Sequence, residues 1–197
     1  NKQLACILSH IKCLMFFKNS DYDKVIIMED DISLELIKKW KQNIYGIIQK
    51  APKSWECIKI DNCNPKMVKS NIQKFKNGVN FLTNVKKNRV STYHVLRNYS
   101  AGFYILNRKY LDSFFKKYYI DNTFNLWNET DYIVSETLLF SLPQCYDYTQ
   151  PLVFSHGFER NIIEKKDEGK DIKVNIHEVN SRRIILNYYN KSIFFSN

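Results

Sequence analysis

Apolar residues recur along the chain in two patterns, one typical of helices and one typical of buried strands. Apolar positions three or four residues apart predict an amphipathic helix over residues 3–18. Short apolar runs predict buried strands at 25–28, 55–60 and 101–106. The same two patterns predict four more elements: a helix between Ser33 and Pro52, a helix capped by Asn107, a short helix over 131–140 and a strand over 144–154.

Strands that alternate with helices predict an α/β sandwich with a largely parallel central sheet. Residues 61–95 are polar and aperiodic, so we expect a long irregular loop there, within a single domain that covers residues 1–197. A loop of that length is usually functional, and we expect it to act as a flap over a ligand site. Ligands of such sheets bind outside the carboxyl ends of the strands.

The composition excludes a disordered chain and leaves the partner open. Hydrophobic residues make up 44% of the chain and aromatic residues 15%, which is enough to form a packed core. The net charge of +10 favours anionic ligands in general. The basic residues form no long cluster on one periodic face, so we expect no specific binding of nucleic acid.

The cysteines and the chain ends bear on the compartment. None of the five cysteines forms a Cys-x-x-Cys pair, so neither a zinc knuckle nor a redox motif is predicted, and a reducing compartment such as the cytoplasm fits best. Cys6 and Cys13 fall within the apolar helical pattern and are expected in the core. The sequence contains no signal peptide and no apolar run that could span a membrane. It opens directly on a helical pattern without Met, which indicates a fragment.

The clearest candidate for chemistry is an acidic triplet at a predicted strand end. Glu29, Asp30 and Asp31 follow the strand at 25–28 directly, and three adjacent carboxylates repel one another unless a cation offsets their charge. Strand alternation would place Glu29 and Asp31 on one side, as two hard oxygen ligands for Mn²⁺ or Mg²⁺. Taken alone, the triplet equally suits a cap for the following helix.

Two motifs resemble glycosyltransferase family 25, the group of lipooligosaccharide β-galactosyltransferases and collagen-type hydroxylysine glycosyltransferases. Residues 4–10 (LACILSH) are similar to the family's Gly-Cys-x-Leu-Ser-His helix, with Ala5 in place of Gly, and residues 25–31 (VIIMEDD) are similar to its strand ending in Glu-Asp-Asp. Residues 99–108 are similar to its small-residue, Tyr-containing strand, and residues 146–151 give a looser match.

The resemblance implies a GT-A-like fold and inverting transfer of a hexose, galactose or glucose, from a UDP-sugar to a glycan or hydroxylysine-type acceptor. Its first, nucleotide-contacting strand is then expected upstream of residue 1. The residues expected to bind the nucleotide-sugar are Ser9, His10, Glu29, Asp30, Asp31, Ser100 and Gly102. His10 equally suits a structural hydrogen bond. A Ser/His hydrolase is excluded, because adjacent helical residues point apart.

An inverting transferase needs a carboxylate that deprotonates the acceptor hydroxyl. Asp131 and Glu136 are the candidates, with Glu136 preferred, although either could be a solvated helix acid. His177 is the preferred third metal ligand beside Glu29 and Asp31, because related folds complete the metal shell with a late histidine. The same fold could instead serve as a non-catalytic carbohydrate-binding domain. A metal-dependent nuclease or phosphatase would need further metal-spaced acids, and the sequence shows none.

Overall fold

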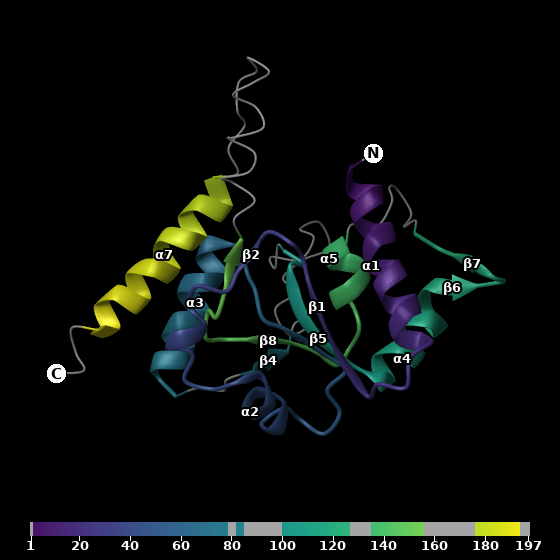
Figure 1. The fold of residues 1–197 in the computed structure, drawn as a ribbon, viewed down its shortest axis with the longest axis horizontal. Helices are drawn as coiled ribbons and strands as arrows, with labels where there is room; N and C mark the ends of the chain where they lie inside the picture. Colours follow the sequence, from purple (N-terminus) through teal and green to yellow (C-terminus); the bar gives the residue numbers. More distant parts are fainter. Residues whose placement is uncertain (1, 79–81, 85–99, 127–134, 156–175, 194–197) are drawn as a thin grey trace, which may run out of the picture.

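The described part of the chain forms a five-stranded mixed sheet with helices packed around it (Figure 1). The computed structural model describes residues 2–78, 82–84, 100–126, 135–155 and 176–193. The strands lie in the order β1 (Lys24–Met28), β5 (Phe103–Asn107), β3 (Cys57–Lys59), β8 (Cys145–Tyr148) and β4 (Leu82–Asn84). The predicted α/β class is therefore confirmed, whereas the GT-A-like topology stays a prediction.

The prediction of a largely parallel sheet is wrong for the described strands. Only β3 and β8 pair in parallel, while β5 runs antiparallel to β1 and β3, and β4 runs antiparallel to β8. A central strand covered on both faces has the same apolar sequence pattern in either direction, which is why the pattern could not reveal this. Because both neighbours of β5 oppose it, β1, β3 and β8 all point the same way, and their carboxyl ends share one edge of the sheet.

Helices cover both faces of the sheet. Helices α1 (Lys2–Lys18), α4 (Arg108–Tyr118) and α5 (Ser135–Phe140) share one apolar core with side chains of β1, β3, β5 and β8. Helix α2 (Ile44–Gln49) packs on the opposite face, where alternate residues of β3 and β5 point. Alternation along the strands therefore supplies two cores from one sheet.

A third core lies between α3 (Pro65–Lys76), α7 (Ile176–Ile193) and β9 (Phe154–Ser155). These two helices stand side by side at one end of the sheet, away from α1 (Figure 1). Strand β9 pairs with β2 (Ile32–Ser33). The remaining described elements are the 3-10 helix η1 (Ile37–Lys39) and the hairpin of β6 (Tyr119–Ile120) and β7 (Thr123–Phe124).

The predicted elements with strong periodicity are confirmed. The helix over 3–18 is α1, the strand at 25–28 is β1, and the strands at 55–60 and 101–106 contain β3 and most of β5. Asn107 caps α4 as predicted, since its side-chain oxygen accepts a hydrogen bond from the backbone N–H of Tyr110 at 3.3 Å.

Three predicted segments are wrong in detail. No single helix spans Ser33 to Pro52, because Ser33 pairs with Phe154 between β2 and β9, and the chain then forms η1 and α2. Residues 61–95 are not one irregular loop, since they contain α3 and β4. Residues 79–81 and 85–95 of the expected flap lie outside the described residues. The strand over 144–154 is two strands, with Pro151 between them.

Two cysteine expectations are also corrected. Cys13 is exposed and Cys6 is only partly buried, so neither is an ordinary core residue. Both lie on α1, whose buried face is formed instead by Ile7, Leu14 and Phe17. None of the described helices is both long enough and apolar enough to cross a membrane.

Arg108, the first residue of α4, forms hydrogen bonds with the chain at and just after the end of α1. Its Nη1 atom donates hydrogen bonds to the carbonyl oxygens of Phe17 at 3.0 Å and Lys18 at 3.2 Å, and its Nη2 atom donates to those of Ser20 and Tyr22. The guanidinium also lies 4.8 Å from the centre of the Phe17 ring. A cation at the carboxyl end of a helix satisfies carbonyl groups that have no partner within the helix.

Replacing Arg108 with leucine is therefore expected to lower the free energy of unfolding by about 1.5–3 kcal/mol, because several hydrogen bonds to a charged donor are lost. Urea denaturation measures this change. The matched control is Lys109→Leu, a substitution of the neighbouring exposed cation, which should cost no more than about 0.5 kcal/mol. Equal losses in both variants would contradict the role of Arg108.

Candidate functional site

Polar residues gather at the sheet edge where β1, β3 and β8 end and β5 begins. Glu29 follows β1, and its backbone N–H donates to the carbonyl oxygen of Gly102 at 2.7 Å. Asp61 follows the residue after β3, and its carboxylate Oδ2 accepts from the N–H of Gly102 at 3.1 Å and from the hydroxyl of Ser100. Segments far apart in the sequence therefore meet at the edge where ligands of α/β sheets bind.

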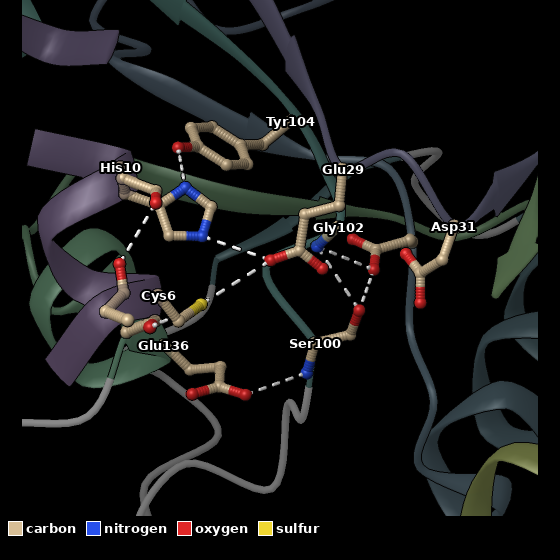
Figure 2. A network of polar contacts seen from close by, with 12 residues as sticks. Cys6, His10, Glu29, Asp31, Ser100, Gly102, Tyr104 and Glu136 are labelled. Carbon is tan, nitrogen blue, oxygen red and sulfur yellow. Dashed lines mark hydrogen bonds and ion pairs between the residues drawn. The ribbon is translucent and has the colours of Figure 1, made fainter. Parts of the chain in front are cut away.

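One part of this edge faces helix α1. Figure 2 shows Cys6 and His10 pointing from the helix toward the carboxylate of Glu29. The Glu29 Oε1 atom lies 3.2 Å from His10 Nε2 and 3.7 Å from Cys6 Sγ. On its other side, His10 Nδ1 lies 2.9 Å from the hydroxyl of Tyr104 on β5. The predicted residues Glu29 and His10 are thus brought into contact.

His10 is almost fully buried, with only 4% of its surface exposed. Burial by itself lowers the pKa of its imidazole, but the interactions with Cys6 and Glu29 outweigh burial and raise that pKa to about 9. The raised pKa favours the protonated imidazole, whose Nε2–H donates a hydrogen bond to the Glu29 carboxylate.

Asp61 is the main site residue that the sequence reading missed. It is 4% exposed, and burial raises the pKa of its carboxyl, although Lys59 and the hydrogen bond from Ser100 act in the opposite direction. An acid that directly follows a buried strand was the available signal, as for the triplet after β1. Because Asp61 begins the polar segment predicted as an irregular loop, the sequence pattern does not single it out.

Ser100 and Gly102 form a tight turn before β5. Ser100 has a φ of 92°, a backbone conformation that L-residues rarely adopt and that persists mostly at functional positions. A Cβ at Gly102 would lie 2.5 Å from Ile32 Cδ1 and 3.1 Å from Asp61 Oδ2. A side chain at this position would displace Ile32 and crowd the Asp61 carboxylate, so glycine suits the close approach of the backbone to Asp61.

Asp31 faces a different part of the edge from Glu29. Its Oδ2 atom accepts a hydrogen bond from Ser155 at 2.7 Å. Ser155 and Asp61 both line a small pocket, together with Arg182 of α7. The chain turns after β1, with the N–H of Ile32 donating to the carbonyl oxygen of Glu29, so strict strand alternation does not extend to Asp31.

Of the remaining predicted residues, the structure brings one to this edge of the sheet. Glu136 on α5 accepts a hydrogen bond from the N–H of Ser100 at 3.2 Å, which brings it to the same edge. Ser9 donates to the carbonyl oxygen of Ala5 within its own helix, and Asp30 is exposed. Asp131 lies outside the described residues. His177 is in the first turn of α7, but its side chain is not among those described.

The carboxylates at this edge are suited to a hard divalent cation. Within the described part of the chain, the Oδ1 atoms of Asp31 and Asp61 are buried without a hydrogen-bond partner. A buried carboxylate oxygen left without a partner is costly, and coordination of Mn²⁺ or Mg²⁺ removes that cost. The donor chemistry therefore fits the metal that the sequence analysis expected.

Comparison with protein families decides the relationship. Residues 1–135 match the profile of Glycosyltransferase family 25 (LPS biosynthesis protein), which is more than half of the chain. The chain belongs to glycosyltransferase family 25. No curated protein and no solved structure gave a match.

Membership of glycosyltransferase family 25 supports a transferase that moves a sugar from a donor to an acceptor. The matched region contains α1, β1 and β5, and so includes Cys6, His10, the acidic triplet, Asp61 and the Ser100–Gly102 turn. The described edge of the sheet is therefore built largely within the part of the chain that identifies the family.

Proposed function

We propose that this chain is an inverting, metal-assisted hexosyltransferase that transfers galactose or glucose from a UDP-sugar to a glycan or hydroxylysine-type acceptor. The observation that carries the proposal is the meeting of Asp31, Asp61, Ser100 and Glu136 around one sheet edge in a chain of glycosyltransferase family 25. Two of these acids have a buried oxygen without a hydrogen-bond partner among the described residues, and the third lies beside the turn that precedes β5.

The donor would lie against the carboxyl ends of β1 and β3. Asp31 and Asp61 would hold Mn²⁺ or Mg²⁺, and such an ion screens a diphosphate and stabilises it as a leaving group. Ser155 positions Asp31, and Ser100 together with the N–H of Gly102 positions Asp61. Arg182 lines the same pocket as Asp61, where its positive charge suits the diphosphate. His177 remains the proposed third ligand.

Glu136 is the proposed general base. Its hydrogen bond from the N–H of Ser100 fixes one carboxylate oxygen next to the turn that contacts Asp61. A base in that position accepts the proton of the acceptor hydroxyl while the hydroxyl oxygen attacks the anomeric carbon. Asp131 stays the alternative base, since the residues around it are not described.

The proposal predicts metal-dependent consumption of a UDP-hexose. Purified chain with Mn²⁺ should hydrolyse UDP-galactose or UDP-glucose slowly without acceptor, and faster with a hydroxylysine peptide or a galactose- or glucose-ended glycan. Release of UDP and the anomeric configuration of the product are measured by coupled assay and NMR. An α-linked UDP-sugar should give a β-linked product. Binding of the sugar without turnover would favour a carbohydrate-binding domain, and cleavage of nucleic acid or of simple phosphate esters would favour a hydrolase.

A further inference from the structure

Cys6, His10 and Glu29 bring three metal-ligating atoms together on the side of Glu29 that faces α1. Cys6 and His10 are four residues apart, so the helix places both side chains on one face. The Cys6 Sγ atom, a nitrogen of His10 and a carboxylate oxygen of Glu29 all lie within 4.8 Å of one another. Among the residues that the structure describes, these three form the group of His, Cys, Asp or Glu side chains whose ligand atoms lie this close together.

Two of the three separations between these atoms are close to those of a tetrahedral metal site. Bonds of about 2.3 Å to sulfur and about 2.1 Å to nitrogen and oxygen, set at tetrahedral angles, separate sulfur from oxygen by about 3.6 Å and nitrogen from oxygen by about 3.4 Å. The corresponding distances here are 3.7 Å from Cys6 Sγ to Glu29 Oε1 and 3.2 Å from His10 Nε2 to Glu29 Oε1. A metal ion would need only small side-chain movements to bind.

The imidazole of His10 is oriented as a metal-binding histidine is. Its Nδ1 atom lies 2.9 Å from the Tyr104 hydroxyl, whose oxygen can accept a hydrogen bond from Nδ1–H, and Nε2 is therefore the ring nitrogen directed at the cluster. A hydrogen bond to the non-ligating nitrogen fixes the tautomer in most metal sites. With the pKa of His10 raised to about 9, Nε2 carries a proton that attracts the Glu29 carboxylate, and a bound cation would take the place of that proton.

We propose that Cys6, His10 and Glu29 bind a borderline-soft divalent cation of the Zn²⁺ type at a site separate from the Asp31 and Asp61 carboxylates. A thiolate and an imidazole select Zn²⁺ over Mn²⁺ or Mg²⁺, which prefer oxygen ligands. Cys6 is partly buried and the Glu29 side chain is 36% exposed, so a fourth position is open to water or to a ligand atom. This proposal does not depend on the transferase activity.

Binding has a defined proton balance. The bond from sulfur to the metal replaces the S–H bond of Cys6, and the bond from Nε2 replaces the Nε2–H bond of His10, whose pKa is raised to about 9, so two protons leave to solvent for each ion bound. The Ser135 hydroxyl lies 3.3 Å from Cys6 Sγ and donates a hydrogen bond that supports the resulting thiolate.

Titration of the metal-free 197-residue chain with Co²⁺, a spectroscopic substitute for Zn²⁺, tests the site directly. The wild type should develop a near-ultraviolet sulfur-to-cobalt charge-transfer band and the intense visible bands of tetrahedral Co²⁺. Added Zn²⁺ should displace the Co²⁺ and abolish these bands. Cys6→Ser should lose the charge-transfer band and more than about 100-fold in affinity, since even the loss of a supporting hydrogen bond costs about 10–100-fold. Tyr104→Phe should keep the band and lose about 10–100-fold.

Cys13→Ser is the matched control, because Cys13 is an exposed cysteine on the same helix. Its Co²⁺ spectrum and affinity should equal those of the wild type. A second ligand variant is Glu29→Gln, which keeps the Cys6 thiol and should also lose the tetrahedral bands. A wild type without charge transfer, or a band that survives in folded Cys6→Ser or disappears in Cys13→Ser, overturns the proposal. Circular dichroism verifies that each variant is folded.

Discussion

Replacing Glu136 with glutamine is expected to lower sugar transfer by about 10²–10⁴-fold, the usual contribution of a general base. Glutamine keeps an oxygen that can accept the hydrogen bond from the N–H of Ser100, so the contact at 3.2 Å and the shape of the edge are preserved. What disappears is the capacity to take the acceptor's proton. Donor affinity should barely change, because the base contacts the acceptor and not the nucleotide.

The comparison variant is Asp131→Asn, which should leave transfer near normal if Glu136 is the base. Asp112→Asn removes an exposed acid from α4 and controls for loss of charge, with an expected cost in stability within about 0.5 kcal/mol. Transfer and UDP binding are measured for all three proteins. If Asp131→Asn loses turnover and Glu136→Gln does not, Asp131 is the base; if both keep near-normal transfer, the base lies elsewhere.

Replacing Asp31 or Asp61 with asparagine is expected to weaken Mn²⁺ binding by more than about 100-fold and to reduce metal-dependent transfer by about 10²–10³-fold. Each change removes a negative charge and one of the two buried oxygens that have no partner in the described residues. The shape of each side chain is retained, so Ser155 and the N–H of Gly102 keep an acceptor. Electron paramagnetic resonance of free Mn²⁺ measures the affinity.

Substitution of single ligands distinguishes the two proposed metal sites. Glu29→Gln should retain Mn²⁺ binding while it loses tetrahedral Co²⁺, and Asp31→Asn should show the reverse. If both variants lose Mn²⁺ binding, Glu29 is a ligand of the hard-cation site, as strand alternation predicted. Unchanged Mn²⁺ affinity in Asp31→Asn and Asp61→Asn would show that neither acid is a ligand.

The structure explains why the acids of the triplet differ in role. Glu29 still follows the direction of β1 and contacts α1, whereas the turn after it carries Asp31 toward β9 and Ser155. Asp30 lies between them and is exposed. One turn therefore directs neighbouring carboxylates to two environments, one with sulfur and nitrogen groups and one with oxygen groups.

Much of the local structure could be predicted from the sequence alone. The helix over 3–18, the strand before the triplet and the Asn107 cap depend on neighbouring residues, because periodicity and capping act within a few positions of the chain. The Asn64-Pro65 start of α3 is an equally local signal, which the polar composition of the surrounding residues obscures. The motifs at residues 4–10 and 25–31 also sufficed to indicate the family, which the match over 1–135 confirms.

Only the tertiary structure decided the direction of β5 and the partners of each acid. Strand direction depends on the path of the chain between strands, and the apolar pattern of a covered strand is the same either way. Asp61 joined the site because β3 ends at the edge where β5 begins, a pairing between residues 41 positions apart. Cys6 gained its partners because α1 packs over Tyr104 and Glu29, contacts that no spacing along the sequence encodes.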